Sequence, residues 1–291
     1  MGDQTESPAT LVLVATPIGN LGDLSQRATE ALQLADVVVC EDTRRTGRLL
    51  ASLGARPRRL VVANEHTEAS AAAAAVRSLQ AGDRVVVVSD AGMPTVSDPG
   101  ERIVRATVEA GFPVSVIPGP SAPVAALAVA GFSAQRYVME GFLPRKGAER
   151  ERALAGIAGE PRTVVVLESP RRLPRTLADL AKVCGSERRA VVVRELTKLH
   201  EEVARGSLGE LMVRFVEPPK GEVVLVVDGA APVEVDDARI IEALTEARLA
   251  GASVKEAVAL VVRRHGVARN RVYALATSAQ ADAVEGPDGV D

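Results

Sequence analysis

Aromatic residues are scarce in this chain of 291 residues. They make up 2% of it, as four phenylalanines and two tyrosines, and there is no tryptophan. Because hydrophobic residues nevertheless account for 47% of the chain, we expect a core built from Val, Leu, Ile and Ala. So few aromatic rings leave little material for stacking nucleic-acid bases. A nucleic-acid partner would therefore be recognised mainly through its backbone and shape.

Cysteine and histidine are also rare, with two and three copies. Cys40 and Cys184 lie far apart at the ends of apolar runs, and we expect each to be a buried free thiol. No spacing of cysteine and histidine resembles a metal site. The sequence thus predicts neither a disulfide framework nor a metal cofactor.

Long apolar runs are missing as well. The longest, residues 122–132, is shorter than the roughly 20 residues that cross a bilayer. Residues 1–8 are polar and acidic, without the basic and apolar parts of a signal peptide. We therefore expect a cytoplasmic protein with no membrane partner. The net charge of −3 also argues against nonspecific binding of nucleic acid, and we expect no DNA partner.

Short valine-rich runs alternate with helix-like segments through the first half of the chain. Such alternation is typical of an α/β fold with a mostly parallel sheet. The predicted strands are residues 11–15, 37–40, 60–62, 85–89 and 114–117. The predicted helices are residues 24–34, 43–53, 69–79, 101–110 and 122–130.

The second half has fewer strand–helix–strand units and longer gaps, which favours a mixed sheet. Its predicted strands are residues 137–140, 163–168, 190–195 and 222–228, with helices at 147–157, 173–183 and 208–215. Residues 236–277 contain three helix patterns and no strand pattern. The predicted domains are residues 9–131, 132–230 and 236–278, and residues 1–8 and 279–291 are expected to be disordered.

Two loops that follow predicted strands carry most of the functional information. One contains Thr16-Pro17-Ile18-Gly19-Asn20, and the other runs from Ser89 to Gly100. A strand, a Gly/Pro loop and a helix commonly place backbone N–H groups around a ligand. Neither loop has the glycine spacing of a dinucleotide-binding loop or a P-loop, and the second holds two carboxylates. A ligand with a cationic centre or ribose hydroxyls therefore fits better than a triphosphate.

Eight short motifs in order extend the signal along the chain. They are TPIGNLGD (16–23), CEDTR (40–44), SDAG (89–92), SDPG (97–100), IPGPSA (117–122), FLPRK (142–146), ESPRR (168–172) and RELTK (194–198). Together they resemble the ribosomal RNA small subunit methyltransferase I family, a branch of the tetrapyrrole methylase superfamily. The resemblance implies two α/β domains with the cofactor cleft between them, followed by a C-terminal helical extension.

The resemblance also implies an activity. This is 2′-O-methylation, dependent on S-adenosylmethionine, of a cytidine in the decoding region of 16S rRNA. The implied partners are 16S rRNA in the 30S subunit and a second copy of the chain in a homodimer. The cofactor-binding residues implied are Pro17, Gly19, Asp90, Ala91, Gly92, Met93, Ser121, Ala122 and Leu167.

Candidates for catalysis and RNA binding are less specific. Asp42, Glu65 and His66 follow predicted strands, where ligands gather in open α/β sheets, and each could act on the reacting hydroxyl. Asp42 could instead pair with a neighbouring arginine, and His66 could cap a strand. The basic residues predicted to bind RNA phosphates are Arg44, Arg45, Arg145, Lys146, Arg171 and Arg172. Solvated surface charge is the alternative for about half of the arginines.

Two other functions stay open at this point. One is a tetrapyrrole C-methylase, whose carboxylated substrate could also use arginines. The other is a non-catalytic ribosome-assembly factor that keeps only a vestigial cofactor pocket. Both glycine-containing loops are intact, which argues against a vestigial pocket.

Overall fold

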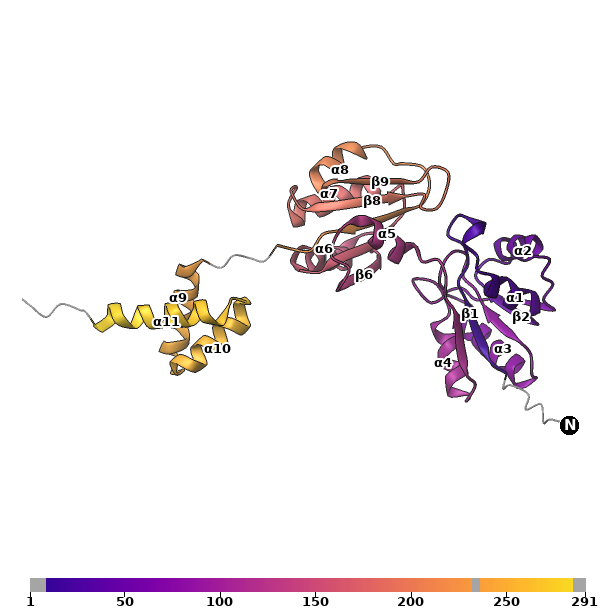
Figure 1. Ribbon diagram of the computed structural model, residues 1–291, viewed down its shortest axis with the longest axis horizontal. Helices are drawn as coiled ribbons and strands as arrows, with labels where there is room; N and C mark the ends of the chain where they lie inside the picture. Colours follow the sequence, from indigo (N-terminus) through magenta and orange to yellow (C-terminus); the bar gives the residue numbers. More distant parts are fainter. Residues whose placement is uncertain (1–8, 232–235, 285–291) are drawn as a thin grey trace, which may run out of the picture. The chain divides into compact units, whose positions relative to one another are not determined.

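The computed structural model describes residues 9–231 and 236–284, which divide into two units (Figure 1). The first unit contains two five-stranded sheets, and the second contains three helices. The α/β class, the two-sheet architecture and the C-terminal helices confirm the predicted fold.

The first sheet is parallel throughout. Its strands are β1 (Leu11–Val14), β2 (Val37–Cys40), β3 (Arg59–Val62), β4 (Val85–Val87) and β5 (Val114–Ile117), in the order β3-β2-β4-β1-β5. Its helices are α1 (Gln26–Leu34), α2 (Thr43–Ser52), α3 (Glu68–Gln80) and α4 (Glu101–Glu109), preceded by the 3-10 helix η1 (Leu21–Asp23). One apolar cluster joins the sheet to α3 and α4, and another joins it to α1 and α2. Strands buried on both faces explain the valine runs.

The second sheet is mixed, as predicted. Its strands are β6 (Tyr137–Phe142), β7 (Thr163–Glu168), β8 (Arg189–Arg194), β9 (Glu202–Ser207) and β10 (Val223–Val227), in the order β6-β7-β10-β8-β9. Only β6 and β7 pair in parallel among the described strands of this sheet. Strand β9 was not predicted. It is an edge strand with Glu202, Arg205 and Gly206 among its six residues, so its hydrophobic pattern is weak.

Helices cover both faces of the second sheet. Helices α6 (Gly147–Gly159), α7 (Leu173–Cys184) and α8 (Leu208–Arg214) share one apolar cluster with it. Helix α5 (Ala122–Ala130) packs on the opposite face through Ala126, Leu127 and Ala130 (Figure 1). The predicted boundary at residue 131 had grouped this helix with the first sheet. Because its sequence is apolar on every side, its periodicity could not indicate which sheet it covers.

The helical unit consists of α9 (Asp237–Leu249), α10 (Val254–His265) and α11 (Arg269–Val284). A capping box between Ser253 and Glu256 begins α10, and Gly266 in the left-handed conformation ends it. Residues 279–284, which we expected to be disordered, continue α11. This segment is alanine-rich and has no glycine or proline before Gly286. The other segments predicted to be disordered, residues 1–8 and 285–291, lie outside the described residues.

The structure can be compared with two further predictions, which concern the cysteine thiols and membrane-spanning helices. Both cysteines are free thiols, but only Cys40 is buried as expected, since Cys184 at the end of α7 is half-buried. Within residues 9–231 and 236–284, no helix has the length and apolar character needed to cross a membrane.

Candidate active site

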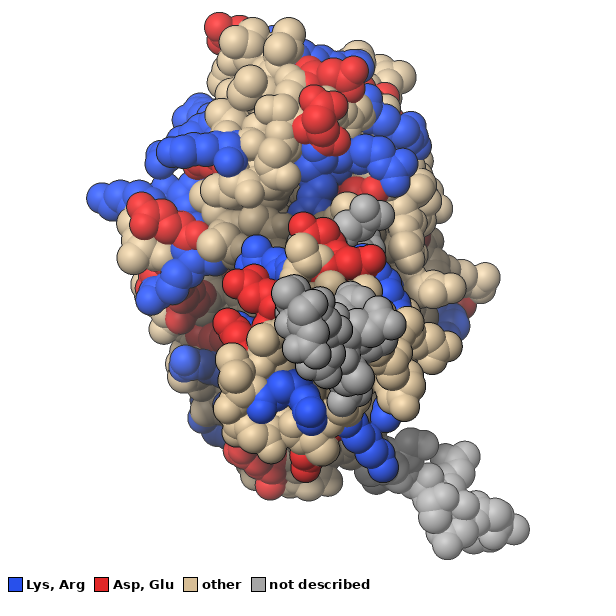
Figure 2. All heavy atoms as spheres, turned by 90° about the vertical axis from the view of Figure 1, so that its left-hand side faces the viewer, with Lys and Arg blue, Asp and Glu red and all other residues tan. Residues whose placement is uncertain are grey.

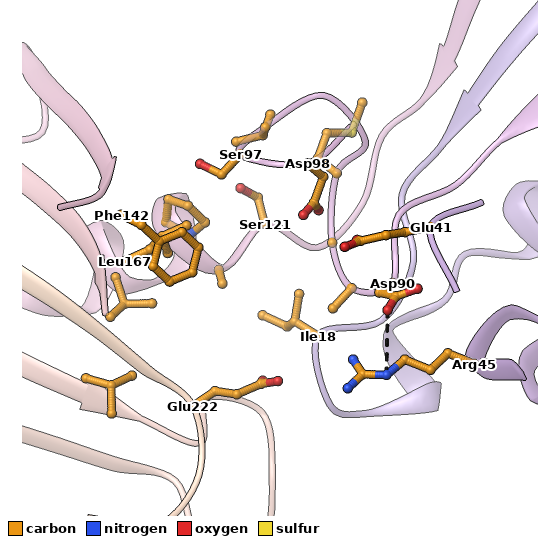
Figure 3. Close-up of a pocket in the computed structure, with 18 of the residues that line it drawn as sticks. Ile18, Glu41, Arg45, Asp90, Ser97, Asp98, Ser121, Phe142, Leu167 and Glu222 are labelled. Atoms are coloured by element: carbon orange, nitrogen blue, oxygen red, sulfur yellow. Dashed lines mark ion pairs between the residues drawn. The ribbon is translucent and has the colours of Figure 1, made fainter. Parts of the chain in front are cut away.

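A cavity of about 950 Å³ lies in the first unit and is lined by residues from both sheets (Figure 3). From the first sheet come the loops after β1, β2 and β4, together with Val62 at the end of β3 and Asn64 after it. From the second come the ends of β6, β7 and β8, the start of β10, and the start of α5. The volume is at the upper end of the range for small-molecule sites, which suits a ligand of nucleoside size or larger.

The two glycine-containing loops are hydrogen-bonded to each other. The backbones of Thr16 and Gly92 exchange two hydrogen bonds of 2.9 and 3.0 Å, and the Thr16 hydroxyl donates to the Ser89 carbonyl at 3.2 Å. Gly92 has φ of +84°, and a Cβ there would lie 3.3 Å from the Ile18 side chain. The backbone beside Ala91 and Gly92 therefore forms part of the cavity wall where a larger residue would not fit.

The loop from Met93 to Gly100 is held in a strained conformation. Thr95 and Ser97 have φ values of +73° and +65°, which cost about 1–3 kcal/mol each for residues other than glycine. The Glu68 carboxylate fixes the end of this loop, because it accepts hydrogen bonds from the backbone of Gly100 at 2.8 Å and of Arg102 at 3.0 Å. This loop conformation places Ser97 and Asp98 in the cavity wall.

Four carboxylates line the cavity from the first sheet, Asp42 among them, and Figure 3 shows the other three. These three are Glu41, Asp90 and Asp98, and Arg45 lies 3.6 Å from Asp90. Burial, with Asp90 nearby, raises the pKa of Glu41. Burial and the neighbouring Glu41 raise the pKa of Asp98 to about 6. Four carboxylates against the two guanidinium groups of Arg44 and Arg45 make this wall acidic, which favours a cationic ligand.

Replacing Asp98 by asparagine is expected to stabilise the protein at neutral pH by about 2 kcal/mol. The pKa of Asp98 is raised from its usual 3.8 to about 6, so the folded state prefers the protonated form. Its contribution to stability is therefore complete below about pH 4 and is lost as the pH rises through 6. Asparagine never ionises, so the gain should be present at pH 7.5 and absent at pH 3.5. Urea unfolding of both proteins at the two pH values measures it, and an equal difference at both would contradict it.

The wall contributed by the second sheet combines aliphatic side chains with two glutamates, Glu168 and Glu222. Leu167, Val193 and Val224 line it, and Phe142 lies beside Leu167 (Figure 3). Strand β10 runs antiparallel to β7 and β8, so Val223 pairs with the last residues of both strands. The start of β10 therefore reaches the same edge as their ends. A ligand in the cavity meets mainly carboxylates on the first-sheet side and an aliphatic surface, with Glu222 beside it, on the other (Figure 3).

The predicted cofactor-binding residues are largely brought together by the structure. Those that line the cavity are Asp90, Ala91, Gly92, Met93, Ser121, Ala122 and Leu167. Pro17 and Gly19 do not line it, whereas Ile18 between them does. Gly19 is covered instead by Lys198, whose side chain a Cβ at position 19 would overlap.

Of the three predicted catalytic residues, Asp42 alone lines the cavity. Its carboxylate caps α2 by accepting a hydrogen bond of 2.7 Å from the backbone of Arg44, and it also pairs with the Arg44 guanidinium. Glu65 and His66 are exposed and lie outside the cavity lining. The Asn64 side chain accepts a hydrogen bond from the His66 backbone, and the resulting turn directs residues 65 and 66 to solvent.

The predicted RNA-binding residues fall into two groups. Arg44 and Arg45 line the cavity and pair with carboxylates, and Arg172 donates to the Leu143 carbonyl at 2.6 Å and pairs with Glu168. Arg172 thus holds the backbone at the end of β6. Arg145, Lys146 and Arg171 are exposed and form no hydrogen bond or ion pair with any described residue.

The distribution of the other basic residues also bears on whether the protein has a surface for RNA. On the face shown in Figure 2, basic and acidic side chains are interspersed. Arg150 lies in the sequence cluster with Arg145 and Lys146, but it is buried and bonded to Asp179. An RNA interface would therefore use individual exposed cations that have no ion pair, because the clusters of basic residues in the sequence contain both surface and interior positions.

Glu41, Asp98, Phe142 and the residues of β10 were not among the predicted site residues. Glu41 directly follows the strand β2, and Asp98 and Phe142 belong to the ordered motifs, so those signals were present. The contribution of β10 depends on its antiparallel pairing, which no local pattern indicates.

Comparisons with known proteins agree with this geometry. Residues 10–212 match the family model of tetrapyrrole (corrin/porphyrin) methylases, and residues 234–280 match that of the RsmI C-terminal HTH domain. Among solved structures, the uroporphyrin-III C-methyl transferase from Thermus thermophilus complexed with S-adenyl homocysteine has the same fold. The TM-score is 0.54 at 20% identity, over 75% of this chain and 96% of that one.

Curated relatives are more similar. The ribosomal RNA small subunit methyltransferase I of Mycobacterium tuberculosis (strain CDC 1551 / Oshkosh) is 44% identical over 92% of this chain and 94% of its own length. The protein of the same name from Escherichia coli O157:H7 is 42% identical over 94% of this chain and 96% of its own. The chain therefore belongs to the tetrapyrrole methylase family and, within it, to the ribosomal RNA small subunit methyltransferase I family.

Proposed function

We propose that this protein transfers a methyl group from S-adenosylmethionine to the ribose 2′-oxygen of a cytidine in the decoding region of 16S rRNA. It would act in the cytoplasm, as a homodimer, on the 30S subunit. The observation that carries the proposal is the cavity, with its carboxylate wall and largely aliphatic wall, in a chain whose relatives are named rRNA methyltransferases. The cytidine, its 2′-oxygen and the homodimer rest on the motif resemblance.

The cavity suits S-adenosylmethionine in size and charge. Its volume of about 950 Å³ accommodates a nucleoside with an amino-acid chain. Ala91, Gly92 and Ala122 leave room for close approach, and the Asp90 carboxylate can accept hydrogen bonds from ribose or amino groups. Glu41, Asp90 and Asp98 favour a cation, and the sulfonium of this cofactor supplies an electrophilic methyl group.

The chain's own residues would contribute alignment, a dry environment and proton acceptance. Methyl transfer requires the attacking oxygen, the methyl carbon and the leaving sulfur to lie in line, so positioning accounts for much of the rate. Leu167, Val193 and Val224 exclude water from one side. A ribose hydroxyl is a poor nucleophile, and the cavity carboxylates are the available acceptors for its proton.

Cations outside the cavity support an RNA substrate. Arg145 and Lys146 lie three and four residues after Phe142 of the cavity, and Arg171 follows the lining residues Ser169 and Pro170. All three are exposed, so phosphates could bind them without breaking any ion pair that the structure describes. A tetrapyrrole substrate would not require the helical unit, which matches the separate model of the RsmI C-terminal HTH domain.

The test is transfer of tritium from labelled S-adenosylmethionine to 30S subunits that lack the modification, followed by nucleoside analysis. Label in 2′-O-methylcytidine that ribonuclease releases is the expected result. Label in another nucleoside would disprove the proposed target, and transfer only to a tetrapyrrole would favour the C-methylase. Cofactor binding without transfer to any rRNA substrate would favour the assembly factor.

A further inference from the structure

Phe142 leaves an aromatic ring exposed in the wall of the cavity. It is one of four phenylalanines in the chain, and its side chain is 58% exposed. It is also the only aromatic residue among the described residues that line the cavity. An aromatic side chain stabilises a fold by being buried, so a role in core packing does not explain why this ring is exposed.

The backbone of β6 is shaped to place this ring. The pairing of β6 with β7 shifts between Met139 and Gly141, so a bulge precedes Phe142. Gly141 has φ of +65°, and a Cβ there would lie 3.4 Å from the Ser97 hydroxyl. Bulges redirect side chains next to functional sites. Here the bulge brings Phe142 into the cavity wall, with the Ser97 loop against the preceding residue (Figure 3).

We propose that Phe142 is the stacking platform for the base of the target nucleotide when that nucleotide is turned out of the RNA. This inference rests on the proposed function. A ribose inside a cavity requires its nucleotide to leave the neighbouring stack, and an aromatic ring replaces part of the lost stacking. Arg145 and Lys146, three and four residues further on, are free to hold the flanking phosphates.

Exposure distinguishes this base from the adenine of the cofactor. Val193 and Val224 of the largely aliphatic wall are 1% and 7% exposed, and Leu167 is intermediate. Phe142 is far more exposed, which places its ring toward the solvent side of the same wall. A base that enters from the RNA meets the ring first, whereas the cofactor occupies the part lined by the glycine loops and the aliphatic side chains.

Phe142→Leu is expected to reduce kcat/KM for 30S subunits by about tenfold, mainly through KM, because base stacking is lost. Phe142→Tyr keeps the ring and should stay within about threefold of the wild type. The affinity for S-adenosylmethionine, measured by calorimetry without RNA, should not change in either variant. Tyr137→Leu, at the opposite end of the same strand, is the matched control and should retain wild-type kinetics.

The absence of tryptophan allows a direct measurement of stacking. In Phe142→Trp the new indole is the only one in the chain, and 30S subunits lacking the modification should quench its fluorescence. In Tyr137→Trp they should not. Quenching by S-adenosylmethionine alone, or a loss of cofactor affinity in Phe142→Leu, would assign the ring to the cofactor and overturn the proposal. So would wild-type kcat/KM in Phe142→Leu. Failure of the wild type to methylate rRNA would instead reject the proposed function itself.

Discussion

Replacing Arg150 by alanine is expected to lower the free energy of unfolding by about 3 kcal/mol. Arg150 is 4% exposed, and its guanidinium donates to Asp179 at 2.9 and 2.8 Å and to the Thr176 hydroxyl at 3.0 Å. The Thr176 hydroxyl in turn donates to buried Glu168 at 2.6 Å. Removing the cation leaves the Asp179 carboxylate with only the longer 3.7 Å contact to Arg175 and takes a donor from the buried Thr176 hydroxyl, and losing one partner of a largely buried ion pair is costly.

Arg152→Ala provides the matched control. Arg152 lies on the same helix, two residues away, and is exposed with no hydrogen bond or ion pair to any part of the chain that the structure describes. Its loss should change the free energy of unfolding by less than about 0.5 kcal/mol. Urea unfolding of the three proteins gives both values. Equal effects at the two positions would contradict the buried network.

Gly92→Val is expected to weaken the binding of S-adenosylmethionine by about a hundredfold or more. The φ of +84° is strained for any β-branched residue, and a Cβ would lie 3.3 Å from Ile18 and 3.5 Å from the Pro120 carbonyl. The added methyl groups would also reduce the space between the two glycine-containing loops. Calorimetric titration with the cofactor measures the loss.

Gly82→Val separates backbone strain from the loss of the site. Gly82 has φ of +80°, but no atom lies within 4 Å of the position that a Cβ would take, and it follows α3 outside the cavity lining. The strain at the two positions is comparable, so both variants should lose stability. The cofactor affinity should fall only in Gly92→Val. Similar affinities in the two variants would show that Gly92 is not needed at the cavity.

The first sheet was predictable because its strands are short valine runs between glycine and proline turns. β2, for example, has the same bounds in the prediction and in the structure. The position of α5 was not predictable, because an entirely apolar helix has no polar face that would orient it. Strand β9 was missed because its pairing with β8 stabilises it more than its own composition does.

The motifs located the site but not the orientation of each side chain. In the first loop they indicated Pro17 and Gly19, whereas Ile18 is the residue that lines the cavity. A strand-end position was also insufficient for Glu65 and His66, because the hydrogen bonds of Asn64 turn that segment outward. Local sequence specifies the loop, and hydrogen bonds within the loop decide which side chains reach the ligand.

Strand order also affects how the protein is made. β10 lies between β7 and β8, which do not pair with each other, yet it is the last strand of its sheet to be synthesised. At a synthesis rate of about 5–20 residues per second, several seconds pass between the synthesis of β7 and that of β10. During that interval the edges of β7 and β8 that β10 will occupy are unpaired, and such edges promote aggregation. A nascent chain that stops before Val223 therefore holds two half-sheets that cannot join.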